Sequence, residues 1–169
     1  MGWIDVAWVK ELESLVVAYP LDPEDVKRPS WWRESLNHKI GWNEKKRMVE
    51  AGAQTAYYGP PIETPCSTDG LQRDHQVPWE NALRSGLVCS PAARREDFYN
   101  FADNVFILDA HVNDVKSDHT PDVWRPANRG VWQKYARDWI DTKSTWGLSI
   151  SEAEKDALAE MLHTYQPGG

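Results

Sequence analysis

The central part of the chain holds side chains that can move a proton and bind a cation. Asp74 and His75 are adjacent, and Asn104, Asn113 and Lys116 follow further along. Hydrolysis of a phosphodiester needs a base that takes a proton from water and a cation that offsets charge on the leaving oxygen. Histidine can supply the base near neutral pH, and carboxylate and amide oxygens hold hard ions such as Mg²⁺. By itself an Asp-His pair also fits a surface pair or a structural hydrogen bond, so both interpretations stay open here.

Two strands and a helix are expected to position these residues. The run from Leu71 to Trp79 predicts a short strand that Pro78 ends, and the apolar run 104–109 predicts a second strand. The stretch 110–118 has helical spacing, which would place Asn113 and Lys116 on one face. Since neighbours in a strand point to opposite faces, one of Asp74 and His75 could hold a metal ion while the other faces a water molecule.

Helices are expected before the first strand. Apolar residues from Trp3 to Val16 recur at three- and four-residue spacing, which predicts an amphipathic helix that ends before Pro20. A short helical turn is expected at 22–25, and a second helix at 44–51. The basic residues of that second helix fit either a solvated face or a phosphate contact. Prolines and glycines predict a loop at 57–70.

Further helices are expected after the first strand. Residues 79–86 predict a short helix and 87–99 a loop. The pattern of 131–143 predicts a helix that packs over the central segment. Ser151 and Glu154 form a capping-box pattern at the start of a last helix, whose inward residues would be Ala157, Leu158, Met161 and Leu162.

Composition limits the classes of partner and compartment. A chain of 169 residues fits one domain, and a net charge of -7 means that the overall field does not attract a polyanion. Ten tryptophans indicate core packing more than exposed stacking on bases. No signal peptide and no membrane span are expected from the N-terminal pattern. Cys66 and Cys89 have no CxxC spacing and are expected to be free thiols, which favours a cytoplasmic location.

The spacing of these residues resembles the HNH, or ββα-metal, nuclease motif. The matching elements are Asp74-His75-x-Val77-Pro78, Asn104-x-x-x-Leu108 and Asn113-x-x-Lys116-x-Asp118. They are similar to the HNH domain of RNA-guided CRISPR effector nucleases and, over a longer stretch, to the C-terminal HNH domain of GmrSD-type restriction enzymes. That longer stretch runs over roughly residues 71–162 and includes a Glu-Ala-x-x-Ser-Gly-like segment and the residues Pro121, Trp124, Pro126, Tyr135, Trp139, Lys143, Gly147 and Leu148.

The chain departs from this family in its first seventy residues and in its cysteines. The N-terminal part matches only loosely and lacks the family's Cys-Thr-Arg element. Residues 133–134 and 163–165 stand where the family often has cysteines, so the disulfide that the resemblance implies is absent.

The resemblance implies a role for each matching residue. His75 would be the general base, and Asp74 and Asn113 would be the ligands of one Mg²⁺ or Mn²⁺ ion. Asn104 would fix the loop and orient the histidine. Lys116 would contact the phosphate or tie down the helix. Asp118 would anchor the helix. The expected contacts to nucleic acid are Arg73, Arg84, Lys116 and Arg129.

The sequence therefore predicts an α+β protein with a small antiparallel ββα-metal motif wrapped by several helices. Residues 1–70 would be a helical lead-in packed on a core formed by 71–169. The expected function is a cytoplasmic, metal-dependent HNH endonuclease that hydrolyses DNA, or RNA, with specificity supplied by a protein partner and no membrane association. The alternatives are a binding or inhibitor module without activity and a metal-dependent enzyme on a non-nucleic-acid substrate. The sequence leaves the oligomeric state open.

Overall fold

The computed structural model describes residues 6–18, 21, 54, 56–59 and 70–164. Within these ranges it has a small α+β fold with one two-stranded sheet and several helices, which confirms the expected fold class at this level. The elements follow in the order α1 (Val6–Ser14), β1 (Leu71–His75), α4 (Trp79–Arg84), η1 (Leu87–Cys89), α5 (Ala92–Tyr99), η2 (Ala102–Asn104), β2 (Val105–Asp109), α6 (Ala110–Lys116), η3 (Arg129–Val131), α7 (Trp132–Thr145) and α8 (Glu152–Leu162).

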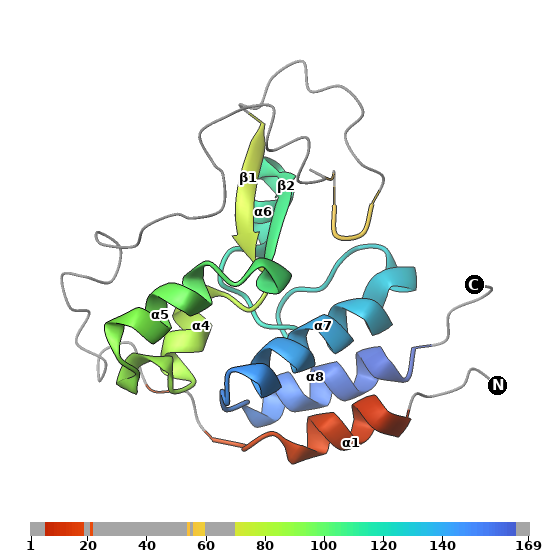
Figure 1. The fold of residues 1–169 in the computed structure, drawn as a ribbon. Coiled ribbons are helices and arrows are strands. Elements are labelled where there is room, and N and C mark those ends of the chain that lie inside the picture. Colours follow the sequence, from red (N-terminus) through yellow and green to blue (C-terminus); the bar gives the residue numbers. More distant parts are fainter. Residues whose placement is uncertain (1–5, 19–20, 22–53, 55, 60–69, 165–169) are drawn as a thin grey trace.

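The sheet is an antiparallel pair whose strands are far apart in the sequence. Leu71 pairs with Asp109 at one end and His75 with Val105 at the other. Helix α6 packs against both strands, as Figure 1 shows. Strand β1 ends at His75, short of the expected Trp79. One more backbone bond follows, from the N–H of Gln76 to the carbonyl of Asn104, before the chain enters α4.

Helices α1, α7 and α8 pack together into a layer below the two-stranded sheet in the view of Figure 1. The predicted inward residues of α8 are buried, and its capping box between Ser151 and Glu154 is present. In α7, Tyr135, Trp139 and Ile140 are fully buried. Trp139 is buried and the other five described tryptophans pack partly buried against the core, so the core-packing expectation is confirmed for these six.

One expectation about the elements is wrong. Residues 87–99 form η1 and α5 instead of a loop. Phe98 is the only buried residue of α5, so the helix has no apolar stripe that a periodicity could reveal. Helix α1 ends at Ser14, before Pro20 as expected, and beyond it Val16 and Ala18 exchange backbone hydrogen bonds with Ile150.

Several predictions fall on residues outside the described ranges. They are the turn at 22–25, the helix at 44–51 with its basic residues, most of the loop at 57–70, and Cys66. The division of the chain at residue 70 therefore stays a prediction. None of the helices that the structure describes has the length and apolar character needed to span a membrane.

Candidate functional site

Most of the chemically interesting residues line one cleft of about 560 Å³ at the end of β1. Strand β1, the start of α4, the end of α5 and the end of α6 supply its walls. The lining residues are Arg73, Asp74, His75, Pro78, Trp79, Glu80, Tyr99, Asn113, Ser117 and Asp118. The structure therefore brings together three of the five residues that the sequence singled out first, namely Asp74, His75 and Asn113.

His75 is the last residue of β1, and its ring orientation is fixed by the backbone of α5. Its Nε2 lies 2.7 Å from the carbonyl oxygen of Tyr99. A carbonyl can only accept, so Nε2 carries the hydrogen and donates it. In the neutral ring this tautomer leaves the lone pair on Nδ1, which is the nitrogen that can take a proton. The imidazole has the tautomer and the half-buried position that a general base in the cleft requires.

Asp74 also borders the cleft, but its carboxylate is part of a buried charged cluster. Its side chain is only 5% exposed, and its two oxygens lie 3.2 and 3.1 Å from Nζ of Lys116. The hydroxyl of Tyr57 also donates to Asp74. Burial raises the pKa of Asp74, although the Lys116 ammonium and the Tyr57 hydroxyl act in the opposite direction. Burial likewise lowers the pKa of Lys116, against the attraction of Asp74.

Lys116 ties α6 to β1 instead of facing the cleft. It is fully buried, and its Nζ also donates to the carbonyl oxygen of His75 at 3.1 Å. A contact with a phosphate in the cleft would require this ammonium to leave Asp74. Of the two roles that the resemblance implies for Lys116, the structure shows the geometry of the second, in which it ties down the helix.

The arrangement of Asp74 and Asn113 does not fit a metal ion. Oδ1 of Asp74 accepts from Lys116, and Oδ2 accepts from Tyr57 and lies 3.1 Å from the same ammonium. The amide nitrogen of Asn113 donates to Oε1 of Gln72 at 2.8 Å. Within the described ranges, no three His, Cys, Asp or Glu side chains form a group that could hold a metal ion. The expectation of a metal-binding group is therefore wrong for the described residues, and the assignment of Asp74 and Asn113 as ligands stays a prediction. A requirement for Mg²⁺ or Mn²⁺ in solution stays a prediction.

Asn104 holds the loop that follows His75. Its Oδ1 accepts from the backbone N–H of Val77 at 2.8 Å, and its Nδ2 donates to the Val77 carbonyl at 3.0 Å. Both Asn104 and Val77 are fully buried, so this side chain satisfies two backbone groups that water cannot reach. Asn104 thus fixes the path of the chain between the histidine and α4 without lining the cleft. Its expected part in catalysis stays a prediction.

The other predicted site residues are spread over the surface. Arg73 lines the cleft, with its guanidinium 5.4 Å from the centre of the Tyr99 ring. By contrast, Arg84 donates to the carbonyl of Leu21, and Arg129 lies over the ring of Trp132. Asp118 is exposed and lines the cleft just after α6. The expected nucleic-acid contacts therefore do not lie together.

The two histidines that the sequence placed near the motif, His111 and His119, lie outside the cleft lining. Exposed His111 lines a separate, largely apolar pocket of about 370 Å³ with Tyr57 and Trp124. His119 is exposed after the end of α6.

Sequence reasoning missed the aromatic residues around His75. Tyr99 and Trp79 line the cleft, and Tyr57 holds Asp74. Tyr57 and Tyr99 fall in stretches that were expected to be loops, so no pattern pointed to them. The only signal for Trp79 was its position next to Pro78, at the start of a predicted helix.

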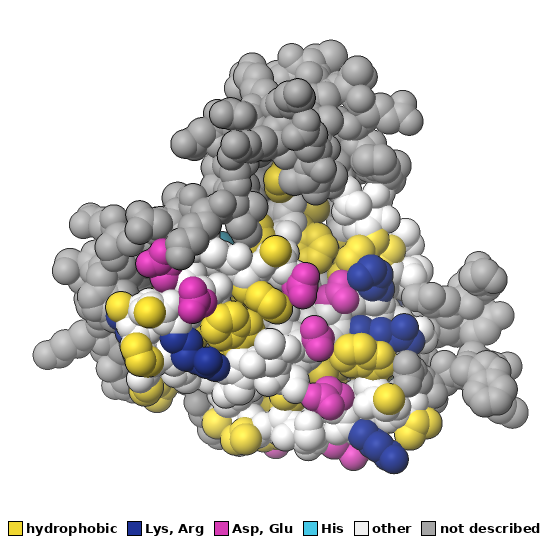
Figure 2. Space-filling model, in the orientation of Figure 1, with side chains coloured by type: hydrophobic (Ala, Val, Ile, Leu, Met, Phe, Trp, Pro, Cys, Tyr) yellow, Lys and Arg dark blue, Asp and Glu magenta, His cyan; other side chains and the backbone are white. Residues whose placement is uncertain are grey.

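The face shown in Figure 2 carries mixed charge. Acidic side chains lie across its middle, over α7, and the Lys and Arg side chains lie apart from one another toward its edges. Among the described residues on this face there is no continuous basic surface of the kind that binds a nucleic-acid backbone.

Comparison with known proteins gives one similar protein, an uncharacterized secreted protein of Arthroderma benhamiae. The two are 39% identical over 135 residues, which are 78% of this chain and 66% of the other protein. The chain thus spans slightly less than two thirds of that protein's length. No family model matches, and no solved structure matches.

This comparison corrects the expected function and location. The similar protein is secreted, which contradicts a cytoplasmic location. It gives no support to nuclease activity, and the described residues contain no metal group. The expectation of a metal-dependent HNH endonuclease that hydrolyses DNA in the cytoplasm is therefore wrong. In the sequence Asp74 has the side chain of a metal ligand, whereas in the structure its carboxylate forms a buried ion pair with Lys116.

Proposed function

We propose that this chain is an extracellular hydrolase of phosphodiesters in which His75 takes the proton from the attacking water. Neither DNA as the substrate nor a step through a metal ion is part of this proposal. The observation that carries it is the hydrogen bond from Nε2 of His75 to the Tyr99 carbonyl, made at the wall of an open cleft. The extracellular location is supported by the similar protein, which is secreted.

The base would act through Nδ1. Water attacks phosphorus, His75 accepts the proton that water loses, and the alcohol leaves with a proton returned from the imidazolium or from solvent. Nε2 stays bonded to the Tyr99 carbonyl throughout, so the ring does not have to turn between the two proton transfers. The imidazolium is stabilised by the same carbonyl because that oxygen carries a partial negative charge.

Arg73 is the cation that would meet the phosphate. It precedes His75 by two residues in β1, so both side chains leave the same face of the strand. Burial lowers the pKa of Arg73, partly offset by Tyr99, and a guanidinium remains charged at neutral pH even so. Glu80 and Asp118 also line the cleft, so its charge is mixed rather than strongly positive.

We also propose that β1, β2 and α6 form the ββα unit of the HNH family, with the helix packed on the two strands. The antiparallel register, the packing of α6 on both strands and the Asn104–Val77 link support this assignment. The expected partners, DNA or RNA and a protein that supplies specificity, stay predictions.

Hydrolysis of bis(p-nitrophenyl) phosphate tests the proposed function. We expect turnover by the full chain and a loss of about 10²- to 10⁴-fold in kcat/KM in His75→Ala, the range that removal of a general base produces. His119→Ala is the matched control, because His119 is exposed and lies outside the cleft lining, and it should stay within about twofold of the wild type.

The assay is run with EDTA, with Mg²⁺ and with Mn²⁺, so that it also decides the open question of the cofactor. The absence of turnover above buffer in all three conditions, or equal rates for His75→Ala and the wild type, would show that the proposal is wrong.

A further inference from the structure

Two aromatic rings stand beside the base in the cleft. Trp79 is the first residue of α4 and Tyr99 the last residue of α5, and both line the cleft with His75. The ring centres of His75 and Tyr99 are 4.7 Å apart, and those of Tyr99 and Trp79 are 5.4 Å apart at an angle of 89°. We call Trp79 and Tyr99 the aromatic wall.

The aromatic wall is held in place by the core. Trp79 lies against Phe98, with 6.2 Å between ring centres, and Phe98 is fully buried. Arg73 lies over the Tyr99 ring, and the backbone carbonyl of Tyr99 holds His75. Because these contacts order the rings before a ligand binds, binding of a ligand to them does not include the conformational entropy cost of fixing their rotamers.

The hydrolysis itself does not need an aromatic wall. A base and a cation are sufficient for the proton transfer and for the charge on phosphate, and His75 and Arg73 provide them from one face of β1. The proposed hydrolysis therefore does not explain why two aromatic side chains from two other helices line the same cleft. Aromatic rings attract other planar rings in stacked or edge-on contacts, with a preference for these geometries beyond simple burial.

We propose that the aromatic wall is a subsite for a planar aromatic group carried by the substrate next to its phosphodiester. The phosphate would lie at Arg73 and His75, and the aromatic group would pack on Tyr99 and Trp79. This inference rests on the proposed function and adds the substrate class, an aromatic ester. Tyr99 then has two roles: its backbone carbonyl orients the base, and its ring binds the aromatic group of the substrate.

Binding of two unreactive probes tests the subsite without relying on turnover. Diphenyl phosphate and dimethyl phosphate carry the same charge and differ in their aromatic groups. In NMR titrations of the full chain, diphenyl phosphate should bind more tightly. Tyr99→Leu, which keeps the backbone carbonyl, should raise the Kd for diphenyl phosphate about three- to tenfold, the factor that loss of one aromatic pair corresponds to, and leave that for dimethyl phosphate unchanged.

Matched variants separate the ring from the fold. Tyr99→Phe keeps the ring and should keep the preference for diphenyl phosphate, and Trp132→Leu, at a tryptophan outside the cleft lining, should not change it. Should Tyr99→Leu not fold, Trp79→Leu carries the same comparison. Equal Kd values for the two probes in the wild type, or an unchanged preference in the folded Tyr99→Leu or Trp79→Leu variant, would overturn the inference.

The two proposals fail in different ways. Loss of the aromatic preference changes the ratio of the two Kd values, whereas failure of the proposed function appears as a wild-type rate equal to that of His75→Ala. A chain that prefers diphenyl phosphate but does not turn over bis(p-nitrophenyl) phosphate would keep the aromatic subsite and lose the hydrolase.

Discussion

Asp74 and His75 are neighbours in β1 and have opposite surroundings. His75 is half-buried at the cleft and bonded to Tyr99, whereas Asp74 is almost fully buried between Lys116 and Tyr57. The alternation of side chains along a strand predicts this division. The alternation does not reveal which residues lie on each side of the strand. In the structure, Asp74 is part of a buried ion pair and His75 lines the cleft.

Removing one partner of this buried pair should cost much more than removing both. Lys116→Met leaves the Asp74 carboxylate buried without its cation and should lower the free energy of unfolding by about 3–5 kcal/mol. Adding Asp74→Asn to Lys116→Met should recover part of that loss. Urea denaturation of both variants checks this. Lys134→Met is the control, because Lys134 is exposed and its pair with the half-buried Asp138 should be worth less than about 1 kcal/mol. A double variant no more stable than Lys116→Met alone would contradict the pairing.

The β1–α4 connection is the element that sets the position of the base. Between His75 and α4 lie Gln76, Val77 and Pro78, all buried. Asn104, at the end of η2, accepts from and donates to Val77, and its own carbonyl accepts from Gln76. One asparagine thus ties the end of β1 to the start of β2 beyond the last strand pair.

Asn104→Ala should loosen this connection. It leaves the buried N–H and carbonyl of Val77 without the side chain that satisfies them, at a cost of about 1–3 kcal/mol for each unsatisfied group. We expect a lower free energy of unfolding in urea and, since His75 begins the same connection, a lower kcat on bis(p-nitrophenyl) phosphate. Asn128→Ala, which removes only an exposed turn contact to Gly130, is the matched control. Wild-type stability in Asn104→Ala would contradict this role.

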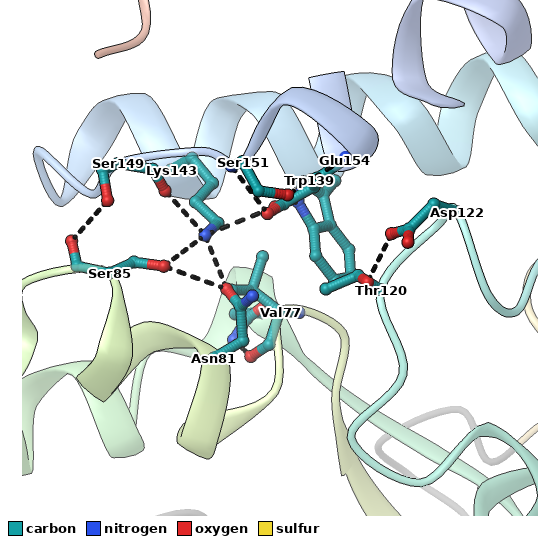
Figure 3. Close-up of polar contacts among 11 residues, drawn as sticks. Val77, Asn81, Ser85, Thr120, Asp122, Trp139, Lys143, Ser149, Ser151 and Glu154 are labelled. Carbon is teal, nitrogen blue, oxygen red and sulfur yellow. Dashed lines mark hydrogen bonds and ion pairs between the residues drawn. The ribbon is translucent and has the colours of Figure 1, made fainter. Parts of the chain in front are cut away.

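At the scale of the whole molecule, a second buried charge joins the helices. Figure 3 shows the Lys143 ammonium between α4, α7 and α8. Its Nζ lies 2.5 Å from Oδ1 of Asn81, 2.9 Å from Oγ of Ser85 and 3.3 Å from Oε1 of Glu154. Trp139 donates to the same Glu154 oxygen at 2.6 Å. Burial lowers the pKa of Lys143, although Glu154 opposes the shift.

Lys143→Met should therefore weaken the whole fold rather than the cleft alone. It leaves Glu154 buried without its cation, and we expect a loss of about 3–5 kcal/mol in the free energy of unfolding. Lys10→Met, at an exposed position of α1, should leave stability within about 0.5 kcal/mol of the wild type. Thermal and urea unfolding followed by circular dichroism measure both. A Lys143→Met protein as stable as Lys10→Met would show that the cluster does not join the helices.

Patterns that repeat along the chain could be predicted, and contacts between distant segments could not. Both strands, the spacing of Tyr135, Trp139 and Ile140 along α7, and the capping box of α8 depend on local sequence patterns and were visible in the sequence. Helix α5 has one buried residue and was missed, and with it Tyr99. Lys116 and Asp74 are 42 positions apart in the sequence. The sequence therefore showed that Asp74 has a carboxylate that can bind a metal ion, but not that this carboxylate is paired with Lys116.

Rescue of the His75→Ala variant by added imidazole is the most direct test of the claim that His75 is the base. We predict that kcat/KM for bis(p-nitrophenyl) phosphate falls at least about 100-fold in His75→Ala and that added imidazole recovers part of it, since removal of a general base costs about 10²- to 10⁴-fold. His119→Ala should show neither the fall nor the recovery. A His75→Ala protein that keeps at least about half of the wild-type rate without imidazole would contradict the account.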